Sequence, residues 1–284
     1  MTILITGATG HLGRLVVENL LTRGVDPLQI VAGARDTTKI ADLVERGVRS
    51  VHLDYSDSAS IAAALRGADT VLLVSSSEVG KRTEQHRAVV DAAKAAGVSK
   101  FVYTSAPRAT TSNLVLAPEH KATEEAVAAS GLPAVILRNN WYTENYAAAV
   151  DQAAKTGVLV ASAGDGRVAS ASRRDYADAA ATALLSDGHI GAVYELGGDV
   201  AWNYAELAAA ISDVVGRKVE YRALSTDEHA AELRASGLDD RTATFLTELD
   251  AGIRDGALAH TDGTLARLIG RPTTPLVDGL RSLS

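Results

Sequence analysis

Short runs of aliphatic residues alternate with longer, alanine-rich amphipathic stretches along the first half of the chain. Uninterrupted apolar runs are typical of strands that are covered on both faces, as in a parallel sheet. The runs predict strands at residues 2–6, 29–34, 48–53, 70–75, 100–105 and 134–138. The stretches between them predict helices at residues 12–23, 37–46, 58–66, 81–97 and 119–130. This alternation predicts right-handed crossovers and therefore a parallel, doubly wound α/β sheet of the Rossmann type.

The second half of the chain has a less regular pattern. Residues 192–198 fit one more strand of the sheet, residues 204–216 fit an amphipathic helix, and residues 222–284 have a mainly helical character. We therefore predict a Rossmann domain over residues 1–150. Residues 151–284 are predicted to supply the final strand of the sheet and a smaller, mainly helical lobe that covers the substrate.

The first predicted strand runs into a glycine-rich segment, TILITGATGHLG (residues 2–13). Between a strand and a helix, this spacing predicts a dinucleotide-binding turn. Gly7 permits the tight turn, Gly10 lets the backbone approach a diphosphate, and Gly13 lets the helix pack closely on the sheet. The N–H groups at the start of that helix would face the diphosphate. The alternative is a strand-to-helix turn that binds no ligand.

The residue at the end of the second strand distinguishes the two nicotinamide dinucleotides. An acidic residue there binds the ribose 2′-hydroxyl of NAD, whereas an arginine accommodates the 2′-phosphate of NADP. The second strand ends in IVAGARD, and Arg35 predicts NADPH as the cofactor. Two alternatives stay open: Asp36 turns towards the ribose instead, or Arg35 is a solvated surface residue.

Composition narrows the classes of partner. The net charge of −7 and the aromatic content of 4% do not provide the basic field and stacking surfaces typical of nucleic-acid binding. The chain has no cysteine, and its seven histidines show no paired spacing for a metal. Its apolar runs are too short to span a bilayer. We expect a cytoplasmic protein without a nucleic-acid, membrane or metal partner, and the oligomeric state stays open, a homodimer included.

Polar segments follow four of the predicted strands, where an open parallel sheet binds its ligands. These segments are residues 53–57, 75–80, 103–110 and 137–146. Asp54 and Tyr55 are expected to face an adenine. The consecutive hydroxyls of Ser75, Ser76 and Ser77 are expected to bond the ribose and phosphates, although each serine could equally cap the end of a strand.

A resemblance to a known family runs nearly end to end and rests on the segments ITGATGHLG, SSSEVG, QHRAVVDAAKAAGV, YTSA, LAPEHKATE, LRNNWYTENY, AGDGRVASASRRDYADAAA, VYELGG and LIGRPTTPL. The chain resembles the NmrA-like branch of the atypical short-chain dehydrogenases. Within that branch it is similar to the bacterial type 2 NAD(P)H:quinone oxidoreductases and to the triphenylmethane dye reductases. The resemblance implies a flavin-free enzyme that uses NADPH to reduce quinones or other planar acceptors by two electrons.

The resemblance also implies which residues contact the cofactor. By position these are Gly7, Thr9, Gly10, His11, Leu12, Arg35, Ser75, Ser76, Ser77, Asn139, Asn140, Trp141, Tyr142, Thr143, Glu144 and Arg173. Gly13 and Asp54 complete the predicted cofactor site.

Ordinary short-chain dehydrogenases use a Tyr-x-x-x-Lys pair, and none of the eight tyrosines here has a lysine four residues later. In the matching segment LAPEH, Leu116 stands where the tyrosine would be and His120 where the lysine would be. This absence disfavours alcohol dehydrogenation and sugar epimerisation, and it fits quinone reduction because an electron-poor quinone accepts hydride readily. His120 is the catalytic candidate, as a hydrogen-bond or proton donor that titrates near the working pH, and Lys121 is a second candidate. The alternative is that His120 only orients the nicotinamide ribose.

Aromatic residues are concentrated in the segment NNWYTENY, which contains Trp141, Tyr142 and Tyr146. Stacking of Trp141 against a planar acceptor is the predicted function, and packing at a hinge is the alternative, above all for Tyr146. Asn139 and Asn140 offer amide groups to the nicotinamide carboxamide or to a quinone oxygen. Trp141 and Asn140 are therefore further catalytic candidates.

Two other functions stay open on the sequence alone. One is a redox sensor that binds NADP(H) and regulates a partner without turnover. The other is a reductase of dyes or imines, which would share the site but not the acceptor.

Overall fold

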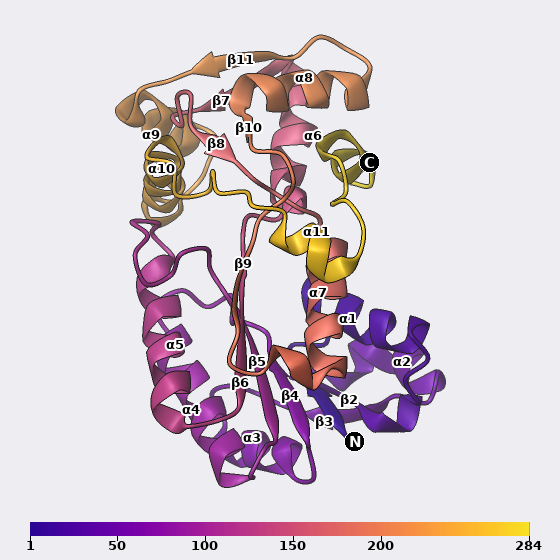
Figure 1. Cartoon of the computed structure of the whole chain (residues 1–284). Coiled ribbons are helices and arrows are strands. Elements are labelled where there is room, and N and C mark those ends of the chain that lie inside the picture. The colour runs from indigo at the N-terminus through magenta and orange to yellow at the C-terminus, as the bar shows by residue number, and fades with distance from the viewer. Residues whose placement is uncertain (284) are drawn as a thin grey trace. The chain divides into compact units, whose positions relative to one another are not determined.

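The computed structural model describes residues 1–283 and divides into two compact units (Figure 1). The first unit consists of Met1–Ala109, Pro118–Asn139 and Arg173–Glu195. The second unit consists of Thr110–Ala117, Asn140–Ser172 and the chain from Leu196 onwards. The units therefore interleave along the chain, whereas the prediction from sequence placed a single boundary at residue 150.

A seven-stranded sheet forms the centre of the first unit, with the strand order β3-β2-β1-β4-β5-β6-β9. Its strands are β1 (Ile3–Ile5), β2 (Ile30–Ala34), β3 (Arg49–His52), β4 (Thr70–Leu73), β5 (Lys100–Ser105), β6 (Ala134–Asn139) and β9 (Val193–Leu196). The strands pair in parallel, and bonds from the Ile136 N–H to Ala192 and from the Asn140 N–H to Leu196 continue the parallel register to β9. The order reverses between β1 and β4, the kind of position at which open α/β sheets bind ligands. The predicted doubly wound α/β class is confirmed.

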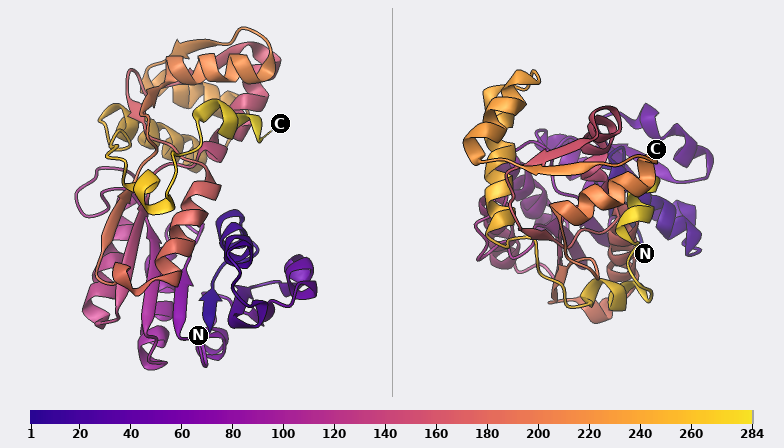
Figure 2. Two further views of the ribbon diagram at one scale, coloured as in Figure 1. Left: turned by 45° about the vertical axis from the view of Figure 1, so that its right-hand side comes forward. Right: turned by 90° about the horizontal axis from the view of Figure 1, so that it is seen from above.

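Helices cover both faces of this sheet (Figures 1 and 2). On one face α1 (His11–Thr22) packs against α7 (Arg173–Leu185), and the Arg23 Nη1 donates to the Thr182 hydroxyl at 3.1 Å. On the other face lie α3 (Ser58–Leu65), α4 (Arg82–Ala95) and α5 (Ala117–Ser130). The helix predicted at residues 37–46 is divided into η2 (Thr37–Ile40) and α2 (Ala41–Glu45), and two further 3₁₀ turns are η1 (Pro27–Gln29) and η4 (Asp187–His189).

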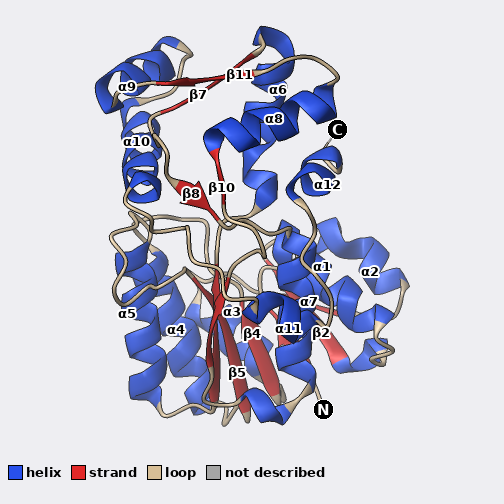
Figure 3. Ribbon diagram, turned by 45° about the horizontal axis from the view of Figure 1, so that its top comes forward, coloured by secondary structure: helices blue, strands red, loops and turns tan. Residues whose placement is uncertain are grey.

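The second unit is mainly helical, with two small sheets (Figure 3). Its elements are η3 (Thr143–Tyr146), α6 (Ala147–Thr156), β7 (Val158–Ala161), β8 (Arg167–Val168), β10 (Trp202–Asn203), α8 (Tyr204–Val215), β11 (Glu220–Ala223), α9 (Thr226–Ala235), α10 (Asp240–Arg254), α11 (Thr264–Ile269) and α12 (Leu276–Arg281). The helix predicted at 204–216 and the mainly helical tail are confirmed. The parallel pair β7–β11 and the antiparallel pair β8–β10 were not predicted. Within residues 1–283, no helix has both the length and the apolar character needed to cross a membrane.

Gly13 allows α1 to begin against the backbone of the turn that precedes it. A Cβ atom at position 13 would lie 2.4 Å from the Gly7 carbonyl oxygen and 3.1 Å from that of Thr6. Both oxygens belong to the backbone, so they cannot move aside as the end of a flexible side chain could. At Gly10 the situation differs, because a Cβ would meet the Gly7 oxygen at 3.2 Å and the backbone is extended (φ −80°, ψ 161°).

We predict that Gly13→Ala lowers the free energy of unfolding by at least about 2 kcal/mol, because the added methyl group forces α1 away from β1. Chemical denaturation followed by circular dichroism measures this change. The matched control is Gly10→Ala, for which we expect a change of no more than about 1 kcal/mol. Equal effects of the two substitutions would contradict this account of the turn.

Candidate functional site

The turn between β1 and α1 leaves the start of the helix without a side-chain cap. Gly7 has a left-handed backbone (φ +61°), and its carbonyl accepts a 2.9 Å hydrogen bond from the Gly10 N–H. Gly10 is the N-cap residue, and within residues 1–283 no side chain caps the helix that it begins. The first helical hydrogen bond runs from the Arg14 N–H to the Gly10 carbonyl at 3.0 Å. The amides of residues 11–13 therefore point outwards from the positive end of the helix, where anions bind.

A half-buried tyrosine fixes this turn to two neighbouring strands. The Tyr55 hydroxyl donates to the Val74 carbonyl at 2.8 Å and lies 2.5 Å from the Thr6 hydroxyl. The Thr6 hydroxyl in turn accepts the Val74 N–H at 3.0 Å. Burial raises the pKa of Tyr55, so its hydroxyl keeps its proton. Tyr55 was expected to face an adenine, but its hydroxyl is committed to holding the glycine turn.

Arg35 follows β2 and extends into solvent, with 68% of its side chain exposed. Its Nη1 lies 3.3 Å from one oxygen of Glu78, and the Lys81 Nζ lies 3.4 Å from the other. The adjacent Asp36 caps η2 by accepting bonds from the N–H (3.1 Å) and hydroxyl (2.5 Å) of Thr38, and these bonds lower the pKa of Asp36. Asp36 is therefore engaged in its own turn, and the contact of Arg35 with a ribose substituent stays a prediction.

The serine segment after β4 is held by hydrogen bonds to neighbouring elements and within itself. The Ser75 N–H donates to the Thr104 hydroxyl at 2.9 Å, and the Ser76 N–H donates to the His86 Nε2 at 2.9 Å. The Glu78 N–H donates to the Ser76 hydroxyl at 3.1 Å. Ser76 is buried and Ser77 is exposed, so the first shapes the segment while the second faces solvent. Ser76 therefore caps the backbone turn after β4, and a cap at the end of a strand was the alternative to a cofactor contact for each serine.

One edge of the first unit gathers most of the predicted cofactor residues. The glycine turn, Arg35, Asp54 and the serines 75–77 directly follow β1, β2, β3 and β4. The strands are parallel, so their carboxyl ends share one edge of the sheet. Asp54 is half-buried there and accepts a 2.9 Å bond from the Ser56 N–H. Along the turn, Thr9 and His11 are exposed whereas Leu12 is buried.

His120 lies in α5 and is only 4% exposed. Its Nδ1 is 2.7 Å from the Tyr103 hydroxyl of β5. On the other side of Tyr103 lies His86 of α4, with its Nδ1 3.5 Å from the same hydroxyl. Tyr103 and His86 were not singled out as site residues, although they occur in the segments YTSA and QHRAVVDAAKAAGV. Lys121, the second catalytic candidate, is exposed.

Both buried histidines of this group are neutral. Burial, and then the positive charge of Arg82, lower the pKa of His86 to about 3. Burial, Arg82 and His86 lower the pKa of His120 to about 3. The expectation that His120 titrates near the working pH is therefore wrong. The neutral ring can donate or accept a hydrogen bond, but it does not carry an extra proton to give away.

The segment after β6 belongs largely to the second unit, where it is tied to the backbone. The Asn140 Oδ1 accepts the Trp141 N–H at 2.7 Å, and its Nδ2 donates to the Leu258 carbonyl at 3.1 Å. Thr143 is buried, with its hydroxyl 2.9 Å from that of Ser170. Both polar atoms of Asn140 thus already have backbone partners. Whether Asn140 also meets a substrate stays a prediction.

The aromatic residues of this segment differ in their surroundings. Tyr146 is buried, with its ring centroid 5.1 Å from that of Trp202 in the core of the second unit. Trp141, Tyr142 and Glu144 are only half-buried. Tyr146 therefore packs in a core, which was the alternative to stacking on a planar acceptor. The stacking role of Trp141 stays a prediction. In the first unit, Asn139 is buried at the end of β6 and Arg173 begins α7.

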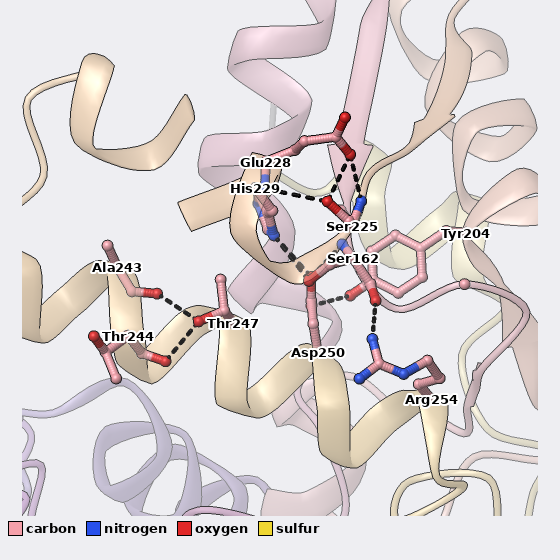
Figure 4. A network of polar contacts seen from close by, with 12 residues as sticks. Ser162, Tyr204, Ser225, Glu228, His229, Ala243, Thr244, Thr247, Asp250 and Arg254 are labelled. Atoms are coloured by element: carbon pink, nitrogen blue, oxygen red, sulfur yellow. Dashed lines mark hydrogen bonds and ion pairs between the residues drawn. The ribbon is translucent and has the colours of Figure 1, made fainter. Parts of the chain in front are cut away.

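A serine, a histidine and an aspartate also meet in the second unit, but not as a hydrolytic triad (Figure 4). The His229 Nδ1 lies 3.0 Å from the Asp250 Oδ2 and 3.3 Å from the Ser162 hydroxyl. A triad needs the serine and the carboxylate on opposite ring nitrogens, whereas here both meet Nδ1. Asp250 also accepts the Ser162 N–H at 2.6 Å. The cluster therefore joins the residue after β7 to α9 and α10. Within residues 1–283, no three His, Asp or Glu side chains converge as metal ligands.

The switch point of the sheet, the glycine turn and the uncapped α1 together define a dinucleotide-binding protein of the Rossmann class. The NmrA-like family matches residues 1–249, and the chain belongs to this family. It is 47% identical to quinone oxidoreductase 2 of Escherichia coli over 281 residues, which are 99% of this chain and 98% of that protein. The predicted family is thereby confirmed.

Two solved structures are similar over the whole length of the chain. The NADPH-dependent quinone oxidoreductase of Escherichia coli complexed with NADPH matches with a TM-score of 0.95 and 46% identity, covering 99% of each chain. The triphenylmethane reductase of Citrobacter sp. complexed with NADP(H) matches with a TM-score of 0.94 and 34% identity, covering 100% of each chain.

The low pKa values of His86 and His120 predict an acid-sensitive first unit. Each folded-state pKa lies near 3, below the unfolded value of about 6.5, so between these values the unfolded chain binds more protons. The free energy of unfolding should therefore fall as the pH drops from about 6.5 towards 3, by up to about 1.4 kcal/mol per pH unit for each histidine. Urea denaturation between pH 7 and pH 4.5 measures this slope.

Carboxylates also contribute to acid sensitivity, so the comparison is between the wild type and His120→Gln. The variant lacks one of the two titrations and should show a shallower slope. Identical slopes in the two proteins would contradict the neutral state assigned to His120.

Proposed function

We propose that this chain is an NADPH-dependent oxidoreductase that reduces quinones by two electrons. The observation that carries the proposal is the 47% identity to the quinone oxidoreductase of Escherichia coli over nearly the whole of both chains. The solved relative from that organism holds NADPH. NADPH, when bound, supplies a hydride, and with one proton from solvent the quinone becomes a hydroquinone.

The residues of the first unit fit this cofactor. The amides of residues 11–13 are suited to the diphosphate, because within residues 1–283 no side chain caps α1 and Gly10 presents no side chain to a ligand. Arg35 is suited to the 2′-phosphate, since guanidinium groups form charge-assisted bonds with phosphate. Asp54 follows β3 and Ser75 and Ser77 follow β4 at the same edge of the sheet, so Asp54 is a proposed contact of the adenine and the two serines are proposed contacts of the ribose and phosphates.

His120 is proposed to act as a neutral hydrogen-bond donor. Its Nδ1 is engaged with Tyr103, which leaves Nε2 as the ring atom for a ligand. A bond from Nε2 to the acceptor oxygen would stabilise negative charge as it develops, and water would supply the final proton. Trp141 and Asn140 are proposed acceptor contacts, Trp141 by stacking on a planar ring.

A dye reductase is the second candidate, because the Citrobacter protein is similar over the whole chain. It would use the same cofactor residues and differ only in the acceptor. A redox sensor without turnover is the third candidate. Its support is the absence of the Tyr-x-x-x-Lys pair, which removes the usual acid and base.

The direct test is the loss of NADPH absorbance at 340 nm with purified protein and 1,4-benzoquinone. We expect catalytic oxidation of NADPH that saturates with quinone. A triphenylmethane dye and a cyclic imine serve as alternative acceptors. Turnover with only the dye or the imine would favour the corresponding reductase, and binding of NADPH without turnover of any acceptor would favour the sensor.

Arg35 and Glu78 predict opposite changes in cofactor selection. Arg35→Asp should raise the KM for NADPH at least about tenfold and narrow the preference over NADH, because it removes the charge-assisted bond. Glu78→Gln should lower the KM for NADPH, because the carboxylate that pairs with Arg35 at 3.3 Å would no longer compete with the phosphate. An unchanged cofactor preference in Arg35→Asp would show that the 2′-phosphate is bound elsewhere.

A cytoplasmic location and a homodimer are further proposals for this protein. Cell fractionation tests the location, and analytical ultracentrifugation of the purified chain tests the oligomeric state.

A further inference from the structure

Three buried side chains in the first unit form a continuous hydrogen-bonded group. They are His86 of α4, Tyr103 of β5 and His120 of α5, with exposed fractions of 0%, 0% and 4%. The proposed function uses only His120. The Tyr103 hydroxyl links the His86 Nδ1 to the His120 Nδ1.

The direction of the hydrogen bonds is set by a backbone amide. The Ser76 N–H donates to the His86 Nε2 at 2.9 Å. An amide N–H cannot accept a hydrogen bond, so this nitrogen carries no proton and the neutral His86 ring holds its proton on Nδ1. That Nδ1–H lies 3.0 Å from the Thr123 hydroxyl and 3.5 Å from the Tyr103 hydroxyl.

Besides His86, two groups lie near the Tyr103 hydroxyl as acceptors for its proton, the Thr123 hydroxyl and the His120 Nδ1. The Tyr103 hydroxyl cannot donate to the His86 Nδ1, because that atom is itself a donor. The Thr123 hydroxyl accepts from His86 and donates to the Glu119 carbonyl at 2.9 Å. The shortest contact of the Tyr103 hydroxyl is the His120 Nδ1 at 2.7 Å. Burial raises the pKa of Tyr103, so the phenol remains a donor.

We propose that Tyr103 is a positioning residue that holds His120 in the Nε2–H tautomer. A nitrogen that accepts the Tyr103 proton cannot carry one, so the proton of the neutral His120 ring lies on Nε2. His120 thus presents a hydrogen-bond donor to whatever occupies the site, without needing to titrate. The effect on catalysis rests on the proposed function, whereas the tautomer itself does not.

The tautomer can be measured without any substrate. Long-range ¹H–¹⁵N correlation spectra of the full-length protein with ¹⁵N-labelled histidine distinguish a protonated ring nitrogen from an unprotonated one, and His120→Gln assigns the His120 signals. We expect the proton of His120 on Nε2 and that of His86 on Nδ1. A proton on the His120 Nδ1 of the wild type would overturn the proposal, whether or not any Tyr103 variant folds.

The consequence for catalysis is tested with Tyr103→Phe, which keeps the ring and removes the hydroxyl. We expect a mixture of His120 tautomers and a fall of about tenfold in kcat with 1,4-benzoquinone, the effect of losing one hydrogen bond. The KM for NADPH should change less than about twofold, because the cofactor residues are untouched. An unchanged tautomer together with an unchanged kcat would refute the role of Tyr103.

The chain offers a matched control in a second tyrosine–histidine pair of the first unit. The Tyr194 hydroxyl lies 2.8 Å from the His189 Nδ1, and neither residue is part of the proposed site. Tyr194→Phe should leave kcat unchanged, and an equal fall in both variants would contradict a specific role for Tyr103. If the wild type reduces no quinone, the proposed function fails, while the ring spectra still decide the tautomer.

Discussion

The close approach of α1 to the end of β1 is the constraint on which the rest of the candidate site depends. A Cβ on Gly13 would lie 2.4 Å from the Gly7 carbonyl oxygen, so only glycine permits this packing without displacement of the backbone. The approach places the uncapped amides of α1 at the switch point of the sheet. Tyr55 and Thr6 then fix the turn to the end of β4. The backbone amides of α1 are thereby held where the proposed diphosphate would bind.

The interior next to this turn is polar, with two neutral histidines beside the buried cation of Arg82. His86 connects the serine segment to Tyr103, and Tyr103 connects it to His120. In the proposed function, a neutral His120 donor stands in place of the Tyr-x-x-x-Lys pair of ordinary short-chain dehydrogenases. A neutral donor suffices for an acceptor that takes hydride readily and receives its proton from water. The chemistry of the acceptor and the electrostatics of the site are therefore consistent with each other.

The local features of this protein were predictable, and the non-local ones were not. Each strand of the central sheet is a short apolar run, and the glycine spacing is read directly from residues 7–13, so both could be predicted. The pairing of β7 with β11 joins segments about sixty residues apart, with no periodic signal to connect them. The capping of η2 by Asp36 could be seen only in the structure, because it depends on how the backbone folds around Thr38.

The chemistry of single residues was harder to predict than the fold. His120 was identified because it occupies the position of the lysine in the Tyr-x-x-x-Lys pattern. Its low pKa comes from burial beside Arg82 and His86, which no sequence spacing reveals. Tyr55 lies within a polar segment and so suggested a ligand contact, although its hydroxyl bonds to Thr6 and to the Val74 carbonyl after β4. In the sequence, Tyr103 is one residue of a buried strand, and nothing in the pattern indicates a role for its hydroxyl. In each case the role depends on contacts between distant parts of the chain.

Calorimetric titration of NADPH into the wild type and into Gly10→Ala tests the central claim most directly. If the backbone at Gly10 must approach the diphosphate, the wild type should bind one NADPH per chain and the variant at least about tenfold more weakly, with its fold intact. Equal affinity in the two proteins, or no binding by the wild type, would contradict the account.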